Sequence, residues 1–299
     1  MQDLLELAVG ATAGGCIYAL IALAYLVVLR PTGVINFAVG EWATAAAFGG
    51  FLALSEAELP YAAGLAAVLA GGFALGCLTE RVAVRPLIER GAPVLAPILA
   101  LLGMLVVFRE SISVGFGPDP RPVPPPFGFG RLELPLPGGL ALAGSYLNFA
   151  TIAASAGVFL GTWLFFERTV AGKCFAAVAI DRRAAALMGI DLRRVNMLAF
   201  GAGAAIAGLA GMLVSPNTSA HYLMGIPLAI QGFTALVVGG VGRVEGALLG
   251  GLVLAWAEQL TVRYAPIPAG YAQGVPLVLL ILFLLVRPAG LLGDRAEGR

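Results

Sequence analysis

Several polar side chains that could contact a solute lie inside long apolar runs of this 299-residue sequence. A charged residue at the centre of a membrane-spanning helix costs about 2.5–3.5 kcal/mol on insertion scales, so such residues line a polar route or pair internally. Asn36 and Glu41 begin one apolar run, in a segment whose Gly33 and Gly40 permit local unwinding. Unwound backbone at membrane depth is tolerated only where it faces protein or a cavity. Two interpretations stay open on the residues alone: Asn36 and Glu41 line a route or its inner gate, or Glu41 caps a helix near the membrane surface.

Three further residues are candidates for the same route, namely Gln231, Thr234 and Glu258. The amide and the hydroxyl could hydrogen-bond a passing zwitterion, but such groups also join neighbouring membrane helices. Glu258 is a second carboxylate within an apolar run and has no obvious charged partner there. Arg109 and Glu110 are adjacent in another run, and we expect them to neutralise each other near the end of a span.

The residue types give little indication of a metal site, a disulfide or a nucleotide-binding loop. His221 is the only histidine, and the cysteines at 16, 77 and 174 form no Cys-x-x-Cys pair. Lys173 follows Gly172 but precedes a cysteine, so the phosphate-binding pattern Gly-x-x-x-x-Gly-Lys-Ser/Thr is not present. We expect this chain to bind no metal and no cofactor and not to be an enzyme.

The composition indicates that membrane-spanning helices position these residues. Apolar residues make up 60% of the chain and charged residues 12%, with a mean hydropathy of +0.93. A soluble domain has about 25% charged residues, and a helix needs about 20 apolar residues to span the hydrocarbon. We expect one all-α, polytopic transmembrane bundle over residues 1–299, with eight or nine spans. The candidate spans are residues 4–29, 34–54, 61–78, 94–114, 146–166, 195–214, 226–240, 246–262 and 271–286.

Basic residues indicate how these spans are oriented, because cytoplasmic loops collect Lys and Arg. They cluster in residues 81–90, 168–194 and 287–299, which share one side if there are nine crossings. Nine crossings put the N-terminus outside and the C-terminus in the cytoplasm. The short run 226–240 could be broken or re-entrant, so eight crossings stay open. The acidic start of the chain, residues 1–6, is unlike a cleavable signal peptide.

The loop 115–144 lies outside in this topology and is rich in proline, including Pro124, Pro125 and Pro126. Consecutive prolines exclude helix and favour an extended path. We expect a structural connector, which could also form part of the landing surface for an external partner.

The loop 168–194 between the fifth and sixth spans has the pattern of a structured element. Residues 176–188 are rich in alanine and leucine, and Gly189, a residue type that often ends helices, follows them. We predict one short amphipathic helix over 176–188, with Ala177 and Ala184 on one face. Such a helix could dock on a soluble partner or lie on the lipid headgroups, and its residues leave both interpretations open.

The same loop resembles the cytoplasmic loop of branched-chain amino-acid ABC transporter permeases, of the high-affinity leucine, isoleucine and valine uptake type. Three other segments are similar to that family in the expected order, namely 15–48, 233–258 and 287–293. Val39 stands where the family has histidine, and Ala176 stands where it usually has arginine. The loop residues that match the family pattern are Thr169, Gly172, Lys173, Asp181, Ala184, Ala185, Leu187, Gly189 and Ile190.

The resemblance implies the permease subunit of an ATP-driven importer in a bacterial-type inner membrane, which translocates branched-chain or other small amino acids. It implies two cytoplasmic ATP-binding subunits that use the ATP, a second permease or second copy of this chain, and an external solute-binding protein, with no nucleic acid. The loop helix would be a coupling helix that contacts an ATP-binding subunit. The contact residues it implies are Asp181, Ala184, Ala185, Gly189 and Ile190.

Two alternative functions stay open. A related permease could transport urea or short amides, because the external binding protein selects the solute. A gradient-driven secondary transporter would instead need an intramembrane ion or proton site, for which Glu41 and Glu258 are the candidate carriers. That alternative leaves the basic helical loop without a role.

Overall fold

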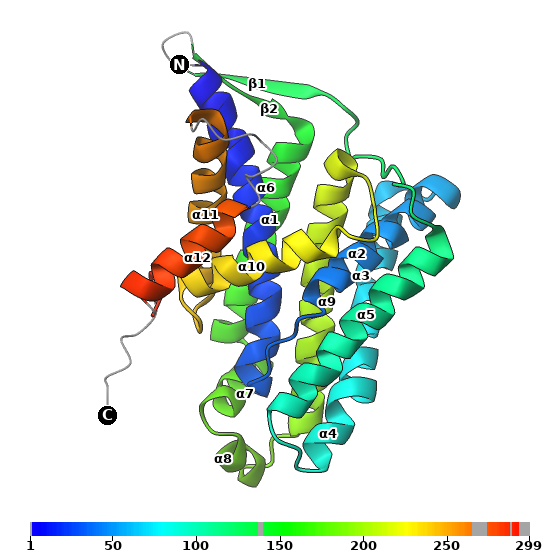
Figure 1. Ribbon diagram of the computed structural model, residues 1–299, viewed down its shortest axis with the longest axis vertical. Helices are drawn as coiled ribbons and strands as arrows, with labels where there is room; N and C mark the ends of the chain where they lie inside the picture. Colours follow the sequence, from blue (N-terminus) through cyan, green and yellow to red (C-terminus); the bar gives the residue numbers. More distant parts are fainter. Residues whose placement is uncertain (1, 137–139, 265–273, 288, 293–299) are drawn as a thin grey trace.

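The computed structural model describes residues 2–136, 140–264, 274–287 and 289–292 (Figure 1). Almost all of the regular structure is helical. Its elements are α1 (Gln2–Thr32), α2 (Val39–Gly50), the π-helix η1 (Phe51–Glu56), α3 (Tyr61–Thr79), the π-helix η2 (Glu80–Val84), α4 (Arg85–Glu89), α5 (Leu95–Phe116), β1 (Arg131–Leu136), β2 (Leu140–Ser145), α6 (Tyr146–Arg168), α7 (Val170–Ile180), α8 (Arg182–Leu187), α9 (Leu192–Thr218), α10 (Gly225–Gly239), α11 (Val244–Tyr264) and α12 (Val275–Val286).

Helix α1 lies at the centre of the bundle because it is apolar on every side. Residues 20–26 are all buried, and α1 contacts α6, α9, α10 and α11. Glycine allows close approach between these helices: a β-carbon on Gly251 of α11 would lie 2.6 Å from the carbonyl oxygen of Gly15 on α1. Small residues at helix contacts are typical of membrane proteins, where close backbone packing drives helix association.

Helix length and composition indicate which helices are candidates for crossing a membrane. Within the described residues, five helices are long and apolar enough to cross a membrane: α1, α3 together with η2 and α4, α5, α6 and α9. The bent pair α10–α11 adds a sixth if it is one span, and α12 is a shorter apolar helix. The predicted polytopic helical bundle is confirmed, and its span count is roughly compatible with the predicted eight or nine.

The predicted span 34–54 is not helical at its start. Helix α1 ends at Thr32, and Gly33 adopts a left-handed φ of +67°. Helix α2 begins only at Val39, and it continues directly into η1. The intervening residues 33–38 form a connection, which we call the 33–38 connection. The unwinding predicted around Gly33 therefore occurs, although α2 starts one residue before Gly40 and includes it.

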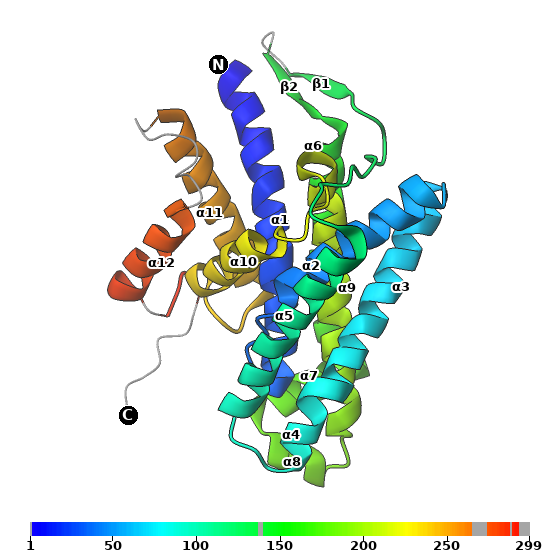
Figure 2. The ribbon, with the colours of Figure 1, turned by 45° about the vertical axis from the view of Figure 1, so that its right-hand side comes forward.

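The predicted broken or re-entrant segment corresponds to α10. Its helix stops at Gly239, and α11 leaves at an angle of 117° to it. Gly240 and Gly242 at this corner have φ values of +102° and +118°, which side chains with a β-carbon rarely adopt. Figures 1 and 2 show α10 lying across α1 rather than alongside it.

A small antiparallel hairpin, β1–β2, lies within the proline-rich loop 115–144. Its register pairs Arg131 with Ser145 and Leu132 with Gly144. A second attachment of the loop is an isolated bridge between Arg121 and Ala220. The all-α prediction missed these strands, although residues 131–136 (RLELPL) have leucine at every second position, the period-two pattern of a strand.

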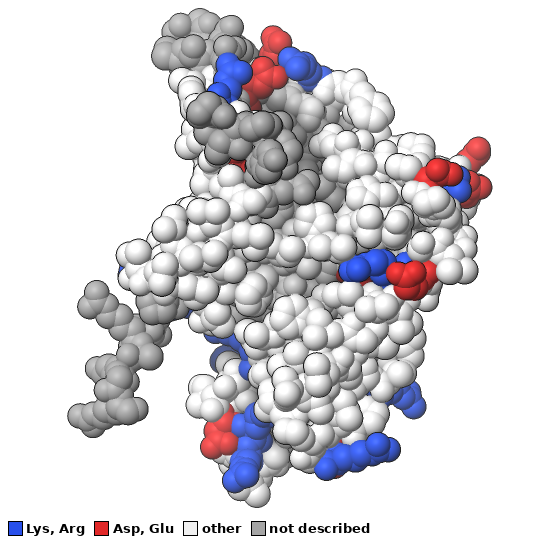
Figure 3. All heavy atoms as spheres, viewed as in Figure 1, with Lys and Arg blue, Asp and Glu red and all other residues white. Residues whose placement is uncertain are grey.

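The two ends of the bundle differ in charge. The N-terminus and β1–β2 lie at one end, and α4, α7 and α8 lie at the other, which we call the basic end (Figures 1 and 2). The predicted basic groups 81–90 and 168–194 belong to these three elements and their flanks. Figure 3 shows basic side chains along this end. In the third predicted group, residues 293–299 lie outside the described residues.

Candidate functional site

Asn36 shapes the turn that leads into α2. Its side chain is buried, and its Oδ1 accepts a hydrogen bond from the backbone nitrogen of Ala38 at 3.0 Å. The backbone nitrogen of Trp42 then donates to the carbonyl of Ala38 at 3.1 Å, which starts the helix. The Asn36 Nδ2 donor has no hydrogen-bond partner among the described residues. Asn36 thus fixes the 33–38 connection and retains a donor inside the protein.

Glu41 lies in the first turn of α2 and forms an ion pair with Arg109 of α5. Arg109 Nη2 is 2.8 Å from Glu41 Oε1, and Arg109 Nε is 3.2 Å from the same oxygen. The Glu41 side chain is 1% exposed and that of Arg109 is 20% exposed. We expected Arg109 to pair with its neighbour Glu110; that expectation was wrong. Arg109 points toward α2 instead, where the buried carboxylate needs a counter-charge.

Helix α10 crosses the first turn of α2 at a pair of glycines. A β-carbon on Gly40 would collide with the carbonyl of Gly225, and one on Gly225 would lie 2.6 Å from the Thr44 hydroxyl. Gln231 and Thr234 follow on α10, and both side chains are buried. Gln231 and Thr234 thus lie on α10, the helix that crosses the start of α2.

Thr234 lines a cavity of about 160 Å³ between α1, α10 and α12. The ring of Phe233 is 5.9 Å from that of Tyr25 and 6.3 Å from that of Phe37, which lies in the 33–38 connection. The Thr234 hydroxyl has no hydrogen-bond partner within the described parts of the chain. The cavity is therefore apolar and aromatic, with one unused hydroxyl in its wall.

Glu258 of α11 contacts a different part of α1 from the other candidate route residues. The hydroxyl of Tyr18 on α1 donates to Glu258 Oε2 at 2.8 Å. Tyr18 and Tyr25 are seven residues apart on α1, which is about 10 Å along one face of a helix. Glu258 consequently lies on the same side of α1 as α10 but closer to the N-terminal end.

Helix α5 exposes charge partway along its apolar length. Glu110 is exposed, as is part of the Arg109 guanidinium, and Arg109 is about 10 Å from the end of α5 at Phe116. Figure 3 shows acidic and basic side chains together about halfway along the molecule on this face. Because lipid solvates charge poorly, this face of α5 requires water or protein against it.

The predicted helix 176–188 is two helices, α7 and α8, separated at Asp181. Asp181 is the N-cap of α8, since its Oδ1 accepts hydrogen bonds from the backbone nitrogens of Arg183 (2.8 Å) and Ala184 (3.0 Å). Aspartate is favoured at such caps and less so within helices, which explains the break. The predicted shared face of Ala177 and Ala184 is therefore wrong. Gly189 ends the unit with φ +84°, as its residue type predicted.

The five predicted coupling residues divide between the two sides of this α7–α8 unit. Ala185 is buried against the bundle, and Ile190 is half-buried beside it. Asp181, Ala184 and Gly189 are exposed. The exposed side also presents large apolar residues at the basic end, with exposed fractions between 83% and 89%: Ile180, Leu187 and Met188.

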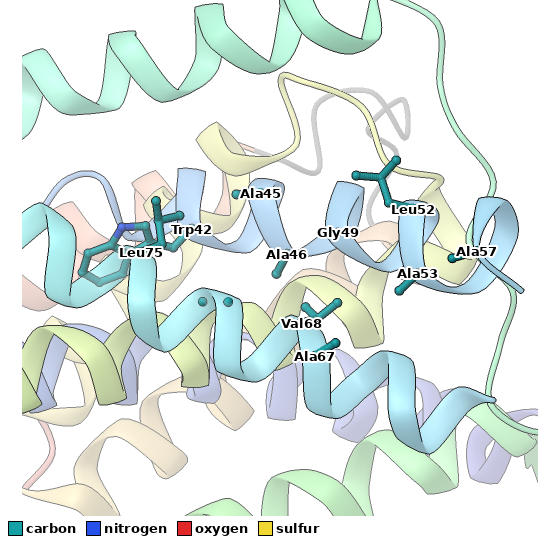
Figure 4. Close-up of a pocket in the computed structure, with 12 residues that line it drawn as sticks. Trp42, Ala45, Ala46, Gly49, Leu52, Ala53, Ala57, Ala67, Val68 and Leu75 are labelled. Atoms are coloured by element: carbon teal, nitrogen blue, oxygen red, sulfur yellow. The ribbon is translucent and has the colours of Figure 1, made fainter. Parts of the chain in front are cut away.

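The groove shown in Figure 4 lies between α2, η1 and α3 and has a volume of about 460 Å³. Its lining is alanine, glycine, valine and leucine, with Trp42 at one end. It contains no charged side chain, so it offers nothing to a zwitterion. Within the described residues, no three His, Cys, Asp or Glu side chains come together as metal ligands.

Sequence patterns missed two arginine contacts, that of Arg109 with Glu41 and that of Arg182 with the end of α1. Arg109 and Glu41 are 68 residues apart, and Arg182 and Thr32 are 150 apart. The available signal was that Arg109 is a cation inside an apolar run, which requires a counter-charge. No pattern in the sequence identifies which carboxylate supplies it.

The fold and these internal charges define a class, the multi-pass membrane permeases. The chain belongs to the family described as branched-chain amino acid transport system / permease component, which matches residues 8–284.

Individual relatives agree with this membership. The high-affinity branched-chain amino acid transport system permease protein LivH of Salmonella typhimurium is 33% identical over 298 residues, covering 93% of this chain and 92% of LivH. The corresponding protein BraD of Pseudomonas aeruginosa is 33% identical over 300 residues, with the same coverage. Both are named as permease proteins of branched-chain amino acid transport systems.

A solved structure is similar in fold. PsaBC from Streptococcus pneumoniae, in complex with Fab, matches with a TM-score of 0.52 and 11% identity, covering 97% of this chain and 93% of that chain. At this identity the likeness concerns the arrangement of helices alone.

Proposed function

We propose that this chain is the permease subunit of an ATP-driven importer that moves branched-chain or other small amino acids across a bacterial-type inner membrane. Two ATP-binding subunits supply the energy, and an external solute-binding protein delivers the substrate. The substrate class comes from the relatives, which cover this chain almost end to end. The chain itself needs no nucleotide site in this arrangement.

The observation that favours ATP coupling is the α7–α8 unit. Three large apolar side chains, those of Ile180, Leu187 and Met188, are exposed at the basic end, where a soluble subunit can cover them. Asp181 and Ala184 of the same unit are also exposed. Because basic residues mark the cytoplasmic side of a membrane protein, this unit and the C-terminus face the cytoplasm in our proposal.

The exposed charges of α5 support a second permease subunit in the complex. Arg109 and Glu110 are adjacent and opposite in sign, so a related subunit can offer complementary charges across a two-fold axis. The route then runs between the two subunits, where water and protein replace lipid. Glu41, Asn36 and the α10 residues Gln231 and Thr234 control it from within this chain, and Glu258 lies further along α1.

Co-purification tests the composition of the complex. The tagged chain is isolated in a mild detergent from its own membranes, and the associated proteins are identified by mass spectrometry. We expect an ATP-binding subunit and a permease, identical or related. Recovery of the chain alone, with transport under an ion gradient, would instead support the secondary-transporter alternative. The ligand of the associated binding protein distinguishes amino acids from urea and short amides.

A further inference from the structure

A side chain from α8 caps the C-terminal end of α1, at the basic end of the bundle. Arg182 Nη1 donates hydrogen bonds to the carbonyl oxygens of Pro31 at 2.6 Å and Thr32 at 2.9 Å. Pro31 and Thr32 are the last two residues of α1. The last carbonyls of a helix have no partner within the helix and form the negative end of its dipole. A guanidinium at this position therefore makes charge-assisted hydrogen bonds, which are stronger than neutral ones.

The position of Arg182 is fixed by its own helix. Asp181 caps α8 through its bonds to the two following backbone nitrogens, so Arg182 is the first helical residue. The side chain of Arg182 is half-buried, and burial lowers the pKa of its guanidinium. Arginine nevertheless stays protonated at neutral pH. The contact between α8 and α1 is thus a permanent charge against two backbone carbonyls.

Nearby acidic side chains do not compete for this charge. Arg182 borders a cavity of about 200 Å³ that Glu80 and Glu89 also line. Glu80 pairs with Arg85 at 2.7 Å, and Glu89 pairs with Arg193 at 2.9 Å. The hydrogen bonds of Arg182 within the described residues go to α1.

A second contact joins α1 to the same unit. The guanidinium of Arg30 lies 5.2 Å from the ring centroid of Phe166 at the end of α6. That ring packs against Phe175 of α7 at 6.2 Å. Helix α1 is therefore attached to the α7–α8 unit at two points, one polar and one aromatic.

The carbonyls that Arg182 contacts directly precede the 33–38 connection. The Thr32 hydroxyl donates to the carbonyl of Val28 at 2.6 Å and accepts from the backbone nitrogen of Val34 at 3.2 Å. These bonds tie the start of the connection to the last turn of α1. The connection then leads to α2, whose first turn bears Glu41 and its ion pair with Arg109.

We infer that Arg182 is the positioning residue that transmits movement of α8 to the 33–38 connection, and through it to the Glu41–Arg109 pair. The inference rests on the proposed function, in which an ATP-binding subunit moves the α7–α8 unit. With both hydrogen bonds in place, movement of α8 displaces the end of α1. Without them only the aromatic contact through Phe166 joins α1 to the α7–α8 unit. Less of the movement then reaches the 33–38 connection, and less substrate is transported per ATP hydrolysed.

Arg183 provides a matched control. It is the next residue in α8, it has the same charge, and its side chain is exposed. No hydrogen bond or ion pair of the Arg183 side chain occurs in the described residues, because its only bond is made by the backbone nitrogen. Loss of positive charge from α8 is therefore the same in Arg183→Ala and in Arg182→Ala, whereas loss of the contact to α1 is specific to the latter.

The test measures substrate transported per ATP hydrolysed by the complete transporter in proteoliposomes. We expect Arg182→Ala to assemble and hydrolyse ATP, with this ratio lowered about 5-fold or more, within the range of allosteric coupling. Arg182→Lys, which can still donate to one carbonyl, should recover part of the ratio, and Arg183→Ala should match the wild type.

Two outcomes overturn the inference. The first is an unchanged ratio in Arg182→Ala, and if transport and ATP hydrolysis fall in proportion, the role of Arg182 is merely structural. The second is an equal fall of the ratio in Arg183→Ala. The wild-type protein in the same assay tests the proposed function separately. If its uptake does not depend on ATP, the proposed function fails before any variant is compared.

Discussion

At the scale of single residues, the ion pair between Glu41 and Arg109 explains how a buried carboxylate persists within an apolar bundle. Glu41 is almost fully buried, and Arg109 supplies both hydrogen bonds to its Oε1. Removing one partner of a buried pair is far more costly than removing both, because the remaining charge stays desolvated. Arg109 thus compensates one oxygen of the buried carboxylate at the start of α2, while Glu41 Oε2 has no hydrogen-bond partner among the described residues.

This asymmetry predicts the stability of variants. Arg109→Ala should destabilise the protein by about 3–5 kcal/mol. The double variant Glu41→Gln/Arg109→Ala should lose less stability than the sum of the losses in Glu41→Gln and Arg109→Ala. The measurement is thermal melting of the detergent-solubilised chain. Glu110→Gln serves as the control, since Glu110 is exposed, and it should melt like the wild type. A wild-type melting temperature for Arg109→Ala would show that the pair contributes nothing.

Substitutions of Asp181 distinguish its role as a helix cap from the role of its charge. Asp181→Arg should lower uptake about 10-fold or more, because loss of an N-cap costs about 1 kcal/mol and adds to the reversed charge on the exposed face. Asn is an equally good N-cap, so Asp181→Asn should keep most of the uptake. Radiolabelled substrate uptake in cells, normalised to membrane expression, measures both. Equal uptake in Asp181→Arg and the wild type would remove Asp181 from the coupling surface.

At the scale of elements, the crossing of α2 and α10 depends on the glycine pair Gly40 and Gly225. Their backbones touch, so the first turn of α2 and the start of α10 move together. In the proposed function, a change in the 33–38 connection reaches Gln231 and Thr234 through this backbone contact.

Gly40→Ala tests this crossing. The added methyl group meets the Gly225 carbonyl, and overpacking of this kind costs about 1–3 kcal/mol. We expect a lower melting temperature together with reduced uptake. Gly71→Ala on α3 is the matched control, because a β-carbon there has open space within 4 Å. Wild-type stability and uptake for Gly40→Ala would mean that α2 and α10 separate freely.

The elements also show what the sequence could predict. Apolar runs located every major helix, and the glycines at 33, 189 and 240 marked real ends, because their local conformations follow from residue type. The break at Asp181 was missed, since an alanine-rich run outweighed one capping residue. The ion pair of Glu41 and the contact of Arg182 join distant segments, so periodicity and spacing could not reveal them.

At the scale of the whole molecule, the chain has a basic end that presents a helical unit and a membrane face that exposes charge. Neither surface suits a monomer in lipid. In the proposed importer, a soluble partner covers the exposed apolar side chains of the α7–α8 unit, and a second subunit or water lies against the charges of α5. Together these surfaces account for the two kinds of partner in the proposed importer.

Transport in a defined system tests this account most directly. The complex purified with the tagged chain is reconstituted in proteoliposomes, and uptake of labelled leucine is measured with and without ATP and the binding protein. We predict uptake that requires ATP and the binding protein and that continues after proton and sodium gradients are collapsed. Uptake by this chain alone, driven by a gradient and independent of ATP, would contradict the account and make Glu41 and Glu258 candidate ion carriers.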